Sequence, residues 1–182
     1  ATQALIFSVG LPHFHFAGNY AISDTITFTG LLQDGLFTGD RASGFVWIGT
    51  FDDTYTTPKP AINLISCQYS VWQNLSIVPA TGHQLAEGWR SITQAGLGVA
   101  LAHRWEHCVV ALAEIGWRIG GGLDNNNDSH AWYSCLSFQN NYAGWTFEDS
   151  QIFGVTLFDC GANGTQFILN AGDYDNVGIA PG

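Results

Sequence analysis

From residue 14 onward, short runs of Val, Ile, Phe, Trp and Thr alternate with clusters of Gly, Asn and Asp. β-Branched and aromatic residues favour strands, whereas Gly, Asn and Asp favour turns. Only residues 2–9 have a helical pattern, and a helix of two turns is marginal by itself. The pattern therefore predicts an all-β chain with one short helix near its beginning.

A five-residue motif recurs four times along the chain. Its second position holds Trp, Trp, Trp and Leu, and its fifth position holds Leu, Cys, Cys and Cys. Strict alternation would place these two positions on opposite faces of a strand. A turn at the fourth position, which holds Asn, His, Ser and Asp, would let both point inward. The four segments are 71–75, 104–108, 131–135 and 156–160.

A second repeat falls between the copies of the first. It begins at Gly88, Gly116, Gly144 and Gly164, which are 28, 28 and 20 residues apart. The Trp that follows the first three glycines is predicted to face inward, and the next residue outward. Two strand-like units that recur every 20–33 residues predict a parallel β-solenoid, in which like residues stack about 4.8 Å apart.

Length and charge limit the classes of protein. The 182 residues suffice for one domain, so we expect residues 1–182 to form a single solenoid domain. Lys and Arg number 5 against 15 Asp and Glu, without a basic run, which argues against nucleic-acid binding. The absence of a long apolar run argues against membrane insertion. Because the chain begins with Ala and contains no Met, we expect it to be part of a longer chain.

Two motifs carry a resemblance to a known superfamily. The first is residues 2–6 followed by Gly18, Tyr20, Ile22 and Ser23, and the second is the Asn-turn segment 71–77. With these motifs the chain resembles the right-handed parallel β-helix proteins of the pectate-lyase-like superfamily, and most of all phage tailspikes and polysaccharide depolymerases. The resemblance implies a right-handed parallel β-helix with a short N-terminal capping helix.

The same resemblance implies a function. It points to a homotrimer, located in a virion tail or extracellular, that binds and cleaves bacterial surface polysaccharide. Other tail proteins are possible partners under the same resemblance. Glycoside hydrolysis is favoured over lyase chemistry, because lyases of the superfamily use calcium-binding Asp clusters and basic residues, and this chain has few of the latter. No cofactor or metal is expected. The alternative is a non-enzymatic glycan-binding or structural module.

Candidate site residues come from the outward positions and the turns. Arg90 and Arg118 are predicted to form an outward ladder that could clamp a sugar carboxylate or sulfate, with Glu148 as an acid or base on the same face. The alternative is a surface Arg–Glu pair that contributes little stability. The turn after Gly120 supplies Asp128 as a catalytic candidate and His130 as a substrate-binding one.

Two carboxylates near successive motif turns would also permit glycoside hydrolysis. Asp159 is the third catalytic candidate, with Glu106 and His107 in the corresponding region of an earlier copy of the motif. His13 and His15 would share one strand face, but no third metal ligand is evident near them.

The aromatic and thiol columns are predicted to be structural. Trp72, Trp105 and Trp132 could form a sugar-stacking platform, but their alignment favours core stacking. Cys108 and Cys135, with Cys160 and Leu75 in the same column, are expected to be interior thiols. Zinc is disfavoured because the chain has no C-x-x-C pair.

Overall fold

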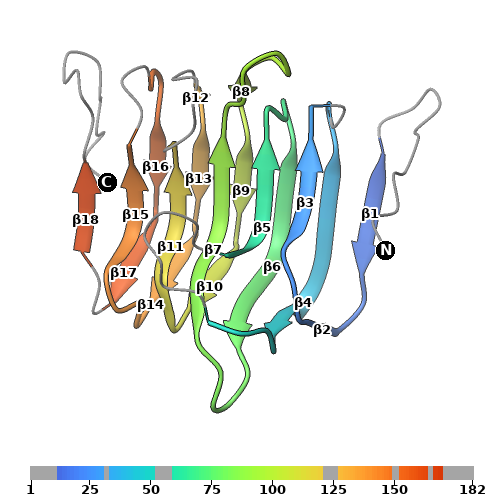
Figure 1. The fold of residues 1–182 in the computed structure, drawn as a ribbon, viewed down its shortest axis with the longest axis vertical. Helices are drawn as coiled ribbons and strands as arrows, with labels where there is room; N and C mark the ends of the chain where they lie inside the picture. The colour runs from blue at the N-terminus through green and yellow to red at the C-terminus, as the bar shows by residue number, and fades with distance from the viewer. Residues whose placement is uncertain are drawn as a thin grey trace.

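The computed structural model describes residues 12–30, 33–51, 59–120, 127–148, 152–163 and 166–169 (Figure 1). The expected helix over residues 2–9 and the glycine at position 164 lie outside these ranges. The described residues form eighteen strands and no helix, which confirms the all-β prediction for them. No helix long and apolar enough to cross a membrane occurs in these ranges.

The strands pair in parallel and form two large sheets and one small one. The ten-stranded sheet contains β1 (His13–Phe16), β2 (Asn19–Ile22), β4 (Leu36–Trp47), β6 (Val71–Pro79), β9 (Arg104–Glu106), β10 (Val109–Ala111), β13 (Ala131–Tyr133), β14 (Leu136–Phe138), β16 (Thr156–Phe158) and β17 (Gly161–Asn163). The six-stranded sheet contains β3 (Ile26–Thr29), β5 (Pro60–Ile65), β7 (Leu85–Ile92), β11 (Ala113–Ile119), β15 (Ala143–Phe147) and β18 (Gln166–Leu169). The two-stranded sheet pairs β8 (Ala100–Leu101) with β12 (Asn127–Asp128). In Figure 1 the chain advances in one direction across the molecule, from the blue strands to the red ones.

Both sequence repeats are in register in the sheets. Trp72 pairs with Trp105, Trp105 with Trp132 and Trp132 with Leu157 in the ten-stranded sheet. In the six-stranded sheet Trp89 pairs with Trp117, and Trp117 with Trp145. All six Trp side chains are buried, which confirms core stacking and excludes a sugar platform on the Trp72 column.

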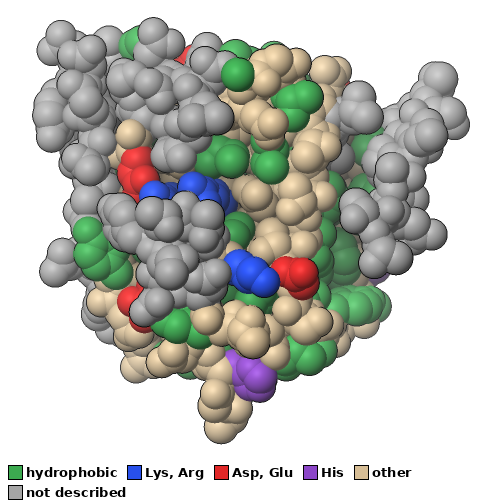
Figure 2. Space-filling model, viewed as in Figure 1, with side chains coloured by type: hydrophobic (Ala, Val, Ile, Leu, Met, Phe, Trp, Pro, Cys, Tyr) green, Lys and Arg blue, Asp and Glu red, His purple; other side chains and the backbone are tan. Residues whose placement is uncertain are grey.

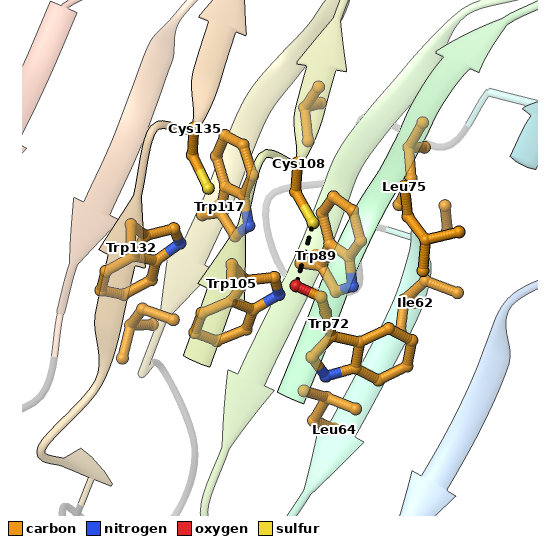
Figure 3. Packing of buried hydrophobic residues seen from close by; sticks show 14 of the residues in the cluster. Ile62, Leu64, Trp72, Leu75, Trp89, Trp105, Cys108, Trp117, Trp132 and Cys135 are labelled. Atoms are coloured by element: carbon orange, nitrogen blue, oxygen red, sulfur yellow. Dashed lines mark hydrogen bonds between the residues drawn. The ribbon is translucent and has the colours of Figure 1, made fainter. Parts of the chain in front are cut away.

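Ring packing joins the two large sheets into one core. Within the columns, Trp105 stacks on Trp132 with centroids 4.7 Å apart, and Trp117 stacks on Trp145 at 5.0 Å. Between the sheets, Trp72 meets Trp89 edge to face at 6.2 Å. Edge-to-face and offset-stacked arrangements are the favourable ones for aromatic pairs. The inner faces of both sheets therefore share a single aromatic interior (Figure 3).

The fourth position of the motif is a left-handed turn in every copy. Asn74, His107, Ser134 and Asp159 have φ angles between 50° and 56°. Such a residue reverses the alternation locally, so the next side chain also points inward. Leu75, Cys108 and Cys135 are accordingly buried, as predicted (Figure 3).

The cysteines in the interior are free thiols. Cys108 donates a hydrogen bond from Sγ to the carbonyl oxygen of Trp72 at 3.3 Å, drawn as the dashed line in Figure 3. Hydrogen bonding to Cys108, together with burial, raises the pKa of Cys135 above its ordinary value. A protonated, enclosed thiol behaves as a small apolar group, which agrees with the predicted structural role of this column.

Close backbone packing explains two glycines of the second repeat. A Cβ atom on Gly88 would lie 2.7 Å from the carbonyl oxygen of Gly116, and one on Gly116 would lie 2.6 Å from that of Gly144. Real Cβ atoms do not approach backbone oxygens that closely, so any side chain would push the strands apart. The repeated glycine is therefore a packing requirement of the six-stranded sheet.

Candidate functional site

Arg118 is the centre of a charged network on the outer side of the six-stranded sheet. Its Nη1 donates to Glu87 Oε1 at 2.7 Å, and its Nη2 and Nε donate to Glu148 Oε2 at 2.7 and 2.9 Å. Glu87 lies on β7, Arg118 on β11, and Glu148 directly follows β15. The sheet register also aligns Arg90 with Arg118 and Arg118 with Thr146, as the sequence predicts.

This network is buried, contrary to the exposed ladder expected from sequence. The side chains of Glu87 and Arg118 are 1% and 7% exposed, that of Glu148 is 15%, and that of Arg90 is 13%. Figure 2 shows this side of the molecule, on which charged side chains appear in small groups among uncharged ones. To bind the Arg118 guanidinium, an acidic sugar would have to displace a carboxylate that is already hydrogen-bonded to it.

Burial and mutual attraction set the charge states of the network. Burial raises the pKa of Glu87, although the guanidinium groups of Arg90 and Arg118 pull it down. Burial by itself would lower the pKa of Arg118, but Glu87 and Glu148 outweigh this effect and raise it. Arg118 therefore stays charged and binds both carboxylates, an arrangement that suits a structural clamp on three neighbouring strands.

His130 is also buried, so its predicted contact with a substrate at the surface is wrong. Its ring stacks on His103 with centroids 5.1 Å apart and planes 7° apart, and its Nδ1 accepts a hydrogen bond from the His103 backbone N–H at 3.2 Å. Ser70 Oγ lies 2.7 Å from His103 Nδ1. Burial lowers the pKa of His103 to about 3 and that of His130 well below its ordinary value. Both imidazoles are therefore neutral interior groups.

Asp128 lies on β12 of the small sheet. Its Oδ1 accepts a hydrogen bond from the backbone N–H of Phe153 at 3.0 Å, and its backbone carbonyl accepts one from Ala102 at 2.8 Å. The side chain is half-buried. Its observed contacts stabilise the connection before β16, and residues 121–126 of the predicted turn lie outside the described ranges.

A different group of charged and aromatic side chains lies on the outer side of the ten-stranded sheet. Trp105 and Trp132 point inward, so the residues on either side of them point outward. The register places Glu106 beside Tyr133 and Tyr133 beside Phe158, with Asp159 in the turn that follows. We call this surface the Tyr133 face; it consists of Arg104, Glu106, Tyr133, Phe158 and Asp159.

The Tyr133 face combines two outward aromatic rings, one half-buried and one exposed, with charged groups of both signs. The Arg104 guanidinium carbon lies 4.7 Å from the centre of the Tyr133 ring, and Arg104 also forms an ion pair with Glu106. The Tyr133 and Phe158 ring centroids are 6.4 Å apart, and Phe158 is 60% exposed. Asp159 Oδ2 accepts a hydrogen bond from Ser134 Oγ at 2.9 Å.

Sequence reasoning found only part of the Tyr133 face. It selected Asp159 and noted Glu106, but it missed Arg104, Tyr133 and Phe158. The signal was present, because these three residues occupy the first and third positions of the same motif whose second position is the buried Trp. The alternation that predicts an inward Trp also predicts outward neighbours.

Two further features lie on the described surface. A cleft of about 590 Å³ lies between the end of β4 and the connection from β6 to β7, and none of the predicted site residues lines it. Its lining residues are Ile48, Gly49, Thr50, Phe51, Gly82, His83 and Gln84. On β1, His13 and His15 share an exposed face, as predicted. Within the described ranges, no set of three or more His, Cys, Asp and Glu side chains is placed to hold a metal ion.

No protein-family model, no curated protein and no solved structure matches this chain.

Proposed function

We propose that the chain is a right-handed parallel β-helix that binds bacterial surface polysaccharide along the Tyr133 face. The order of strand pairing supports the coil architecture. The strands β9, β10 and β11 occur in this order along the chain, and each pairs with the corresponding member of the next set, β13, β14 and β15. A chain that revisits the same positions in the same order, with like residues stacked, is expected for successive coils of a solenoid.

The observation that carries the proposed function is a pair of neighbouring outward rings, the half-buried Tyr133 and the exposed Phe158, beside hydrogen-bonding charges. A sugar ring presents C–H groups on its faces and hydroxyl groups around its edge. Aromatic rings supply a large, rigid apolar surface for the former, and carboxylates and guanidinium groups bind hydroxyls. Because the two rings sit on neighbouring strands, the face extends along the direction in which the strands stack, as a chain-like ligand requires.

The charge of the chain favours a neutral glycan. The formal net charge is −10, and the single guanidinium of the Tyr133 face is paired with Glu106. A polyanionic polysaccharide would be repelled by the overall field of the protein. We therefore assign a polysaccharide of neutral hexoses as the ligand class.

Cleavage of the bound glycan is the second candidate function. Glu106 and Phe158 lie two strand steps apart in register, and Asp159 follows Phe158, so the backbones of the two acidic residues are about 10 Å apart. Inverting glycosidases hold their two carboxyl groups at roughly 6.5–9.5 Å. A separation of the carboxyl groups in this range would make the chain an inverting hydrolase, with Glu106 and Asp159 as the carboxylate pair.

The test of binding compares aromatic residues on and off the Tyr133 face. Binding of bacterial capsule and lipopolysaccharide glycans, neutral and acidic, is measured with the native chain and with Phe158→Ala and Tyr133→Ala. We expect each substitution to weaken binding of a neutral glycan about tenfold, which corresponds to about 1.4 kcal/mol. Tyr142→Ala is the matched control, because Tyr142 is 47% exposed but lies in the turn before β15. Equal affinity in all four proteins would reject this placement.

The test of cleavage measures new reducing ends on a glycan that binds. Hydrolysis that disappears in Glu106→Gln and in Asp159→Asn would establish the carboxylate pair. Binding without new reducing ends would establish the non-enzymatic module, and ultraviolet-absorbing unsaturated products would instead establish lyase chemistry.

A further inference from the structure

Two histidines on β1 aim at one oxygen atom. His13 and His15 are two residues apart, so their side chains lie on the same face of the strand. His13 Nε2 and His15 Nδ1 each lie 3.0 Å from the hydroxyl oxygen of Thr38 on the neighbouring strand β4. The two ring nitrogens are therefore at most 6.0 Å apart, and both histidines belong to an exposed part of the surface.

A carboxylate on β4 orients the second imidazole. Asp40 Oδ1 lies 3.3 Å from His15 Nε2. A carboxylate can only accept a hydrogen bond, so it favours the His15 tautomer that carries its proton on Nε2. The lone pair of His15 Nδ1 then points toward Thr38, and the hydroxyl of Thr38 donates to it. Histidine ligands of metals commonly have this arrangement, with one ring nitrogen on the metal and the other bound to a carboxylate.

We propose that His13 Nε2 and His15 Nδ1 chelate a divalent transition-metal ion, with Asp40 as the residue that orients His15. Imidazole ligands favour Zn²⁺, Ni²⁺ and Cu²⁺ over Mg²⁺ and Ca²⁺, which prefer oxygen ligands. Because the Thr38 hydroxyl donates its single hydrogen to His15, His13 Nε2 donates to the hydroxyl oxygen in the metal-free chain. On metal binding His13 changes tautomer, with its proton on Nδ1, the ion takes the position toward which both ring nitrogens point, and the Thr38 hydroxyl turns away or joins as a weak ligand.

The site lies on the same sheet as the Tyr133 face, because the register aligns Thr38 with Gln73 and Gln73 with Glu106. It uses none of the residues of that face, so the proposal does not depend on the proposed function.

Closing the chelate requires only side-chain rotation. Metal–nitrogen bonds of about 2.0–2.1 Å need the two ring nitrogens within about 4 Å of each other. The His15 side chain is 51% exposed and that of Asp40 is 66% exposed, so both can move without disturbing the core. Two protein ligands leave the remaining coordination positions to water, which predicts a solvent-accessible site.

The experiment is a calorimetric titration of the chain with Zn²⁺ and with Ni²⁺. We expect one binding site per chain that is lost in His13→Gln and in His15→Gln, while Asp40→Asn lowers the affinity about tenfold. His83→Gln is the control, because His83 is an exposed histidine that lines the distant cleft. Unchanged affinity in the His13 and His15 variants, or an equal loss in the His83 variant, overturns the proposal.

Nitrogen NMR of the histidine side chains identifies the ligand atoms in the folded native chain. On addition of Zn²⁺, the signals of His13 Nε2 and His15 Nδ1 should shift, and His15 Nε2 should remain protonated. Shifts confined to other histidines would overturn the assignment. Equal binding of Ca²⁺ or Mg²⁺ in the calorimeter would overturn imidazole ligation itself.

Discussion

The outer sides of the two large sheets differ in how far their arginine side chains are exposed to solvent. On the six-stranded sheet, Arg118 is 7% exposed and is held between Glu87 and Glu148. On the ten-stranded sheet, the side chain of Arg104 is 52% exposed and lies over the ring of Tyr133. Both arginines occupy outward positions of regular strands. An outward position is therefore not the same as an accessible one, and the accessible face is the better candidate for ligand binding.

The largest expected effect is loss of the buried network. Arg118→Ala removes the partner of two carboxylates and leaves Glu87 buried beside only Arg90 among its nearby guanidinium groups. Breaking a buried ion pair in this way costs about 3–5 kcal/mol, whereas an exposed pair contributes less than about 1 kcal/mol. Chemical denaturation of Arg118→Ala and of its counterpart Arg104→Ala should therefore give very different losses of unfolding free energy.

Equal losses of unfolding free energy in Arg118→Ala and Arg104→Ala would contradict the distinction between the buried and the exposed arginine. Arg118→Lys extends the test if the alanine variant does not fold. Lysine keeps the charge but cannot reproduce the planar set of three N–H donors that Arg118 uses. We expect an intermediate loss of stability.

The next largest effect is a dependence of stability on pH. The six-stranded sheet buries a charged network, whereas the ten-stranded sheet buries two neutral imidazoles at its inner side. His103 has a folded pKa of about 3, and that of His130 is well below its ordinary value. An unfolded histidine takes up a proton near pH 6.5, so the unfolded state binds more protons between that pH and the folded pKa. Stability is then full above pH 6.5 and falls as the pH drops, by up to about 1.4 kcal/mol per pH unit for each imidazole.

Unfolding free energies measured between pH 7 and pH 4.5 would check this slope. His130→Phe keeps an aromatic ring in the stack and removes one titrating group, so the histidine part of the slope should fall by about half. A slope that does not change in this variant would show that other groups cause the acid sensitivity.

The smallest effect concerns the turn at the edge of the Tyr133 face. His107 has a φ of 51°, and it is exposed. A left-handed conformation is unfavourable for residues with a Cβ atom and costs glycine nothing, so His107→Gly should raise stability by about 0.5–1 kcal/mol. The melting temperature measures this change. A lower melting temperature would mean that the imidazole makes a stabilising contact that outweighs the strain.

Much of the interior was predictable from the sequence. The repeated Trp positions predicted the two buried columns, and the residues at the fourth motif position predicted a turn, which the structure shows to be left-handed. The site residues were predicted less well. Arg118 and Glu148 do meet, but in a buried network, and His130 occupies the interior and not a ligand groove. The first error arose because alternation along a strand says which side a residue faces and not what covers that side. The second arose because His130 was assigned to a solvated turn, whereas it directly precedes β13 and packs in the interior.

The sequence by itself determined the repeat, the inward columns and the turns between them, because these follow from local alternation and from side chains that bond the nearby backbone in a turn. Only the tertiary structure decided which outward residues are enclosed. The contacts of Arg118 with Glu87 and Glu148 join residues about 30 positions apart, and they depend on strand register and on burial. The exposure of Phe158 is likewise a property of the assembled surface. Accessibility depends on every neighbouring segment at once, and no local pattern encodes it.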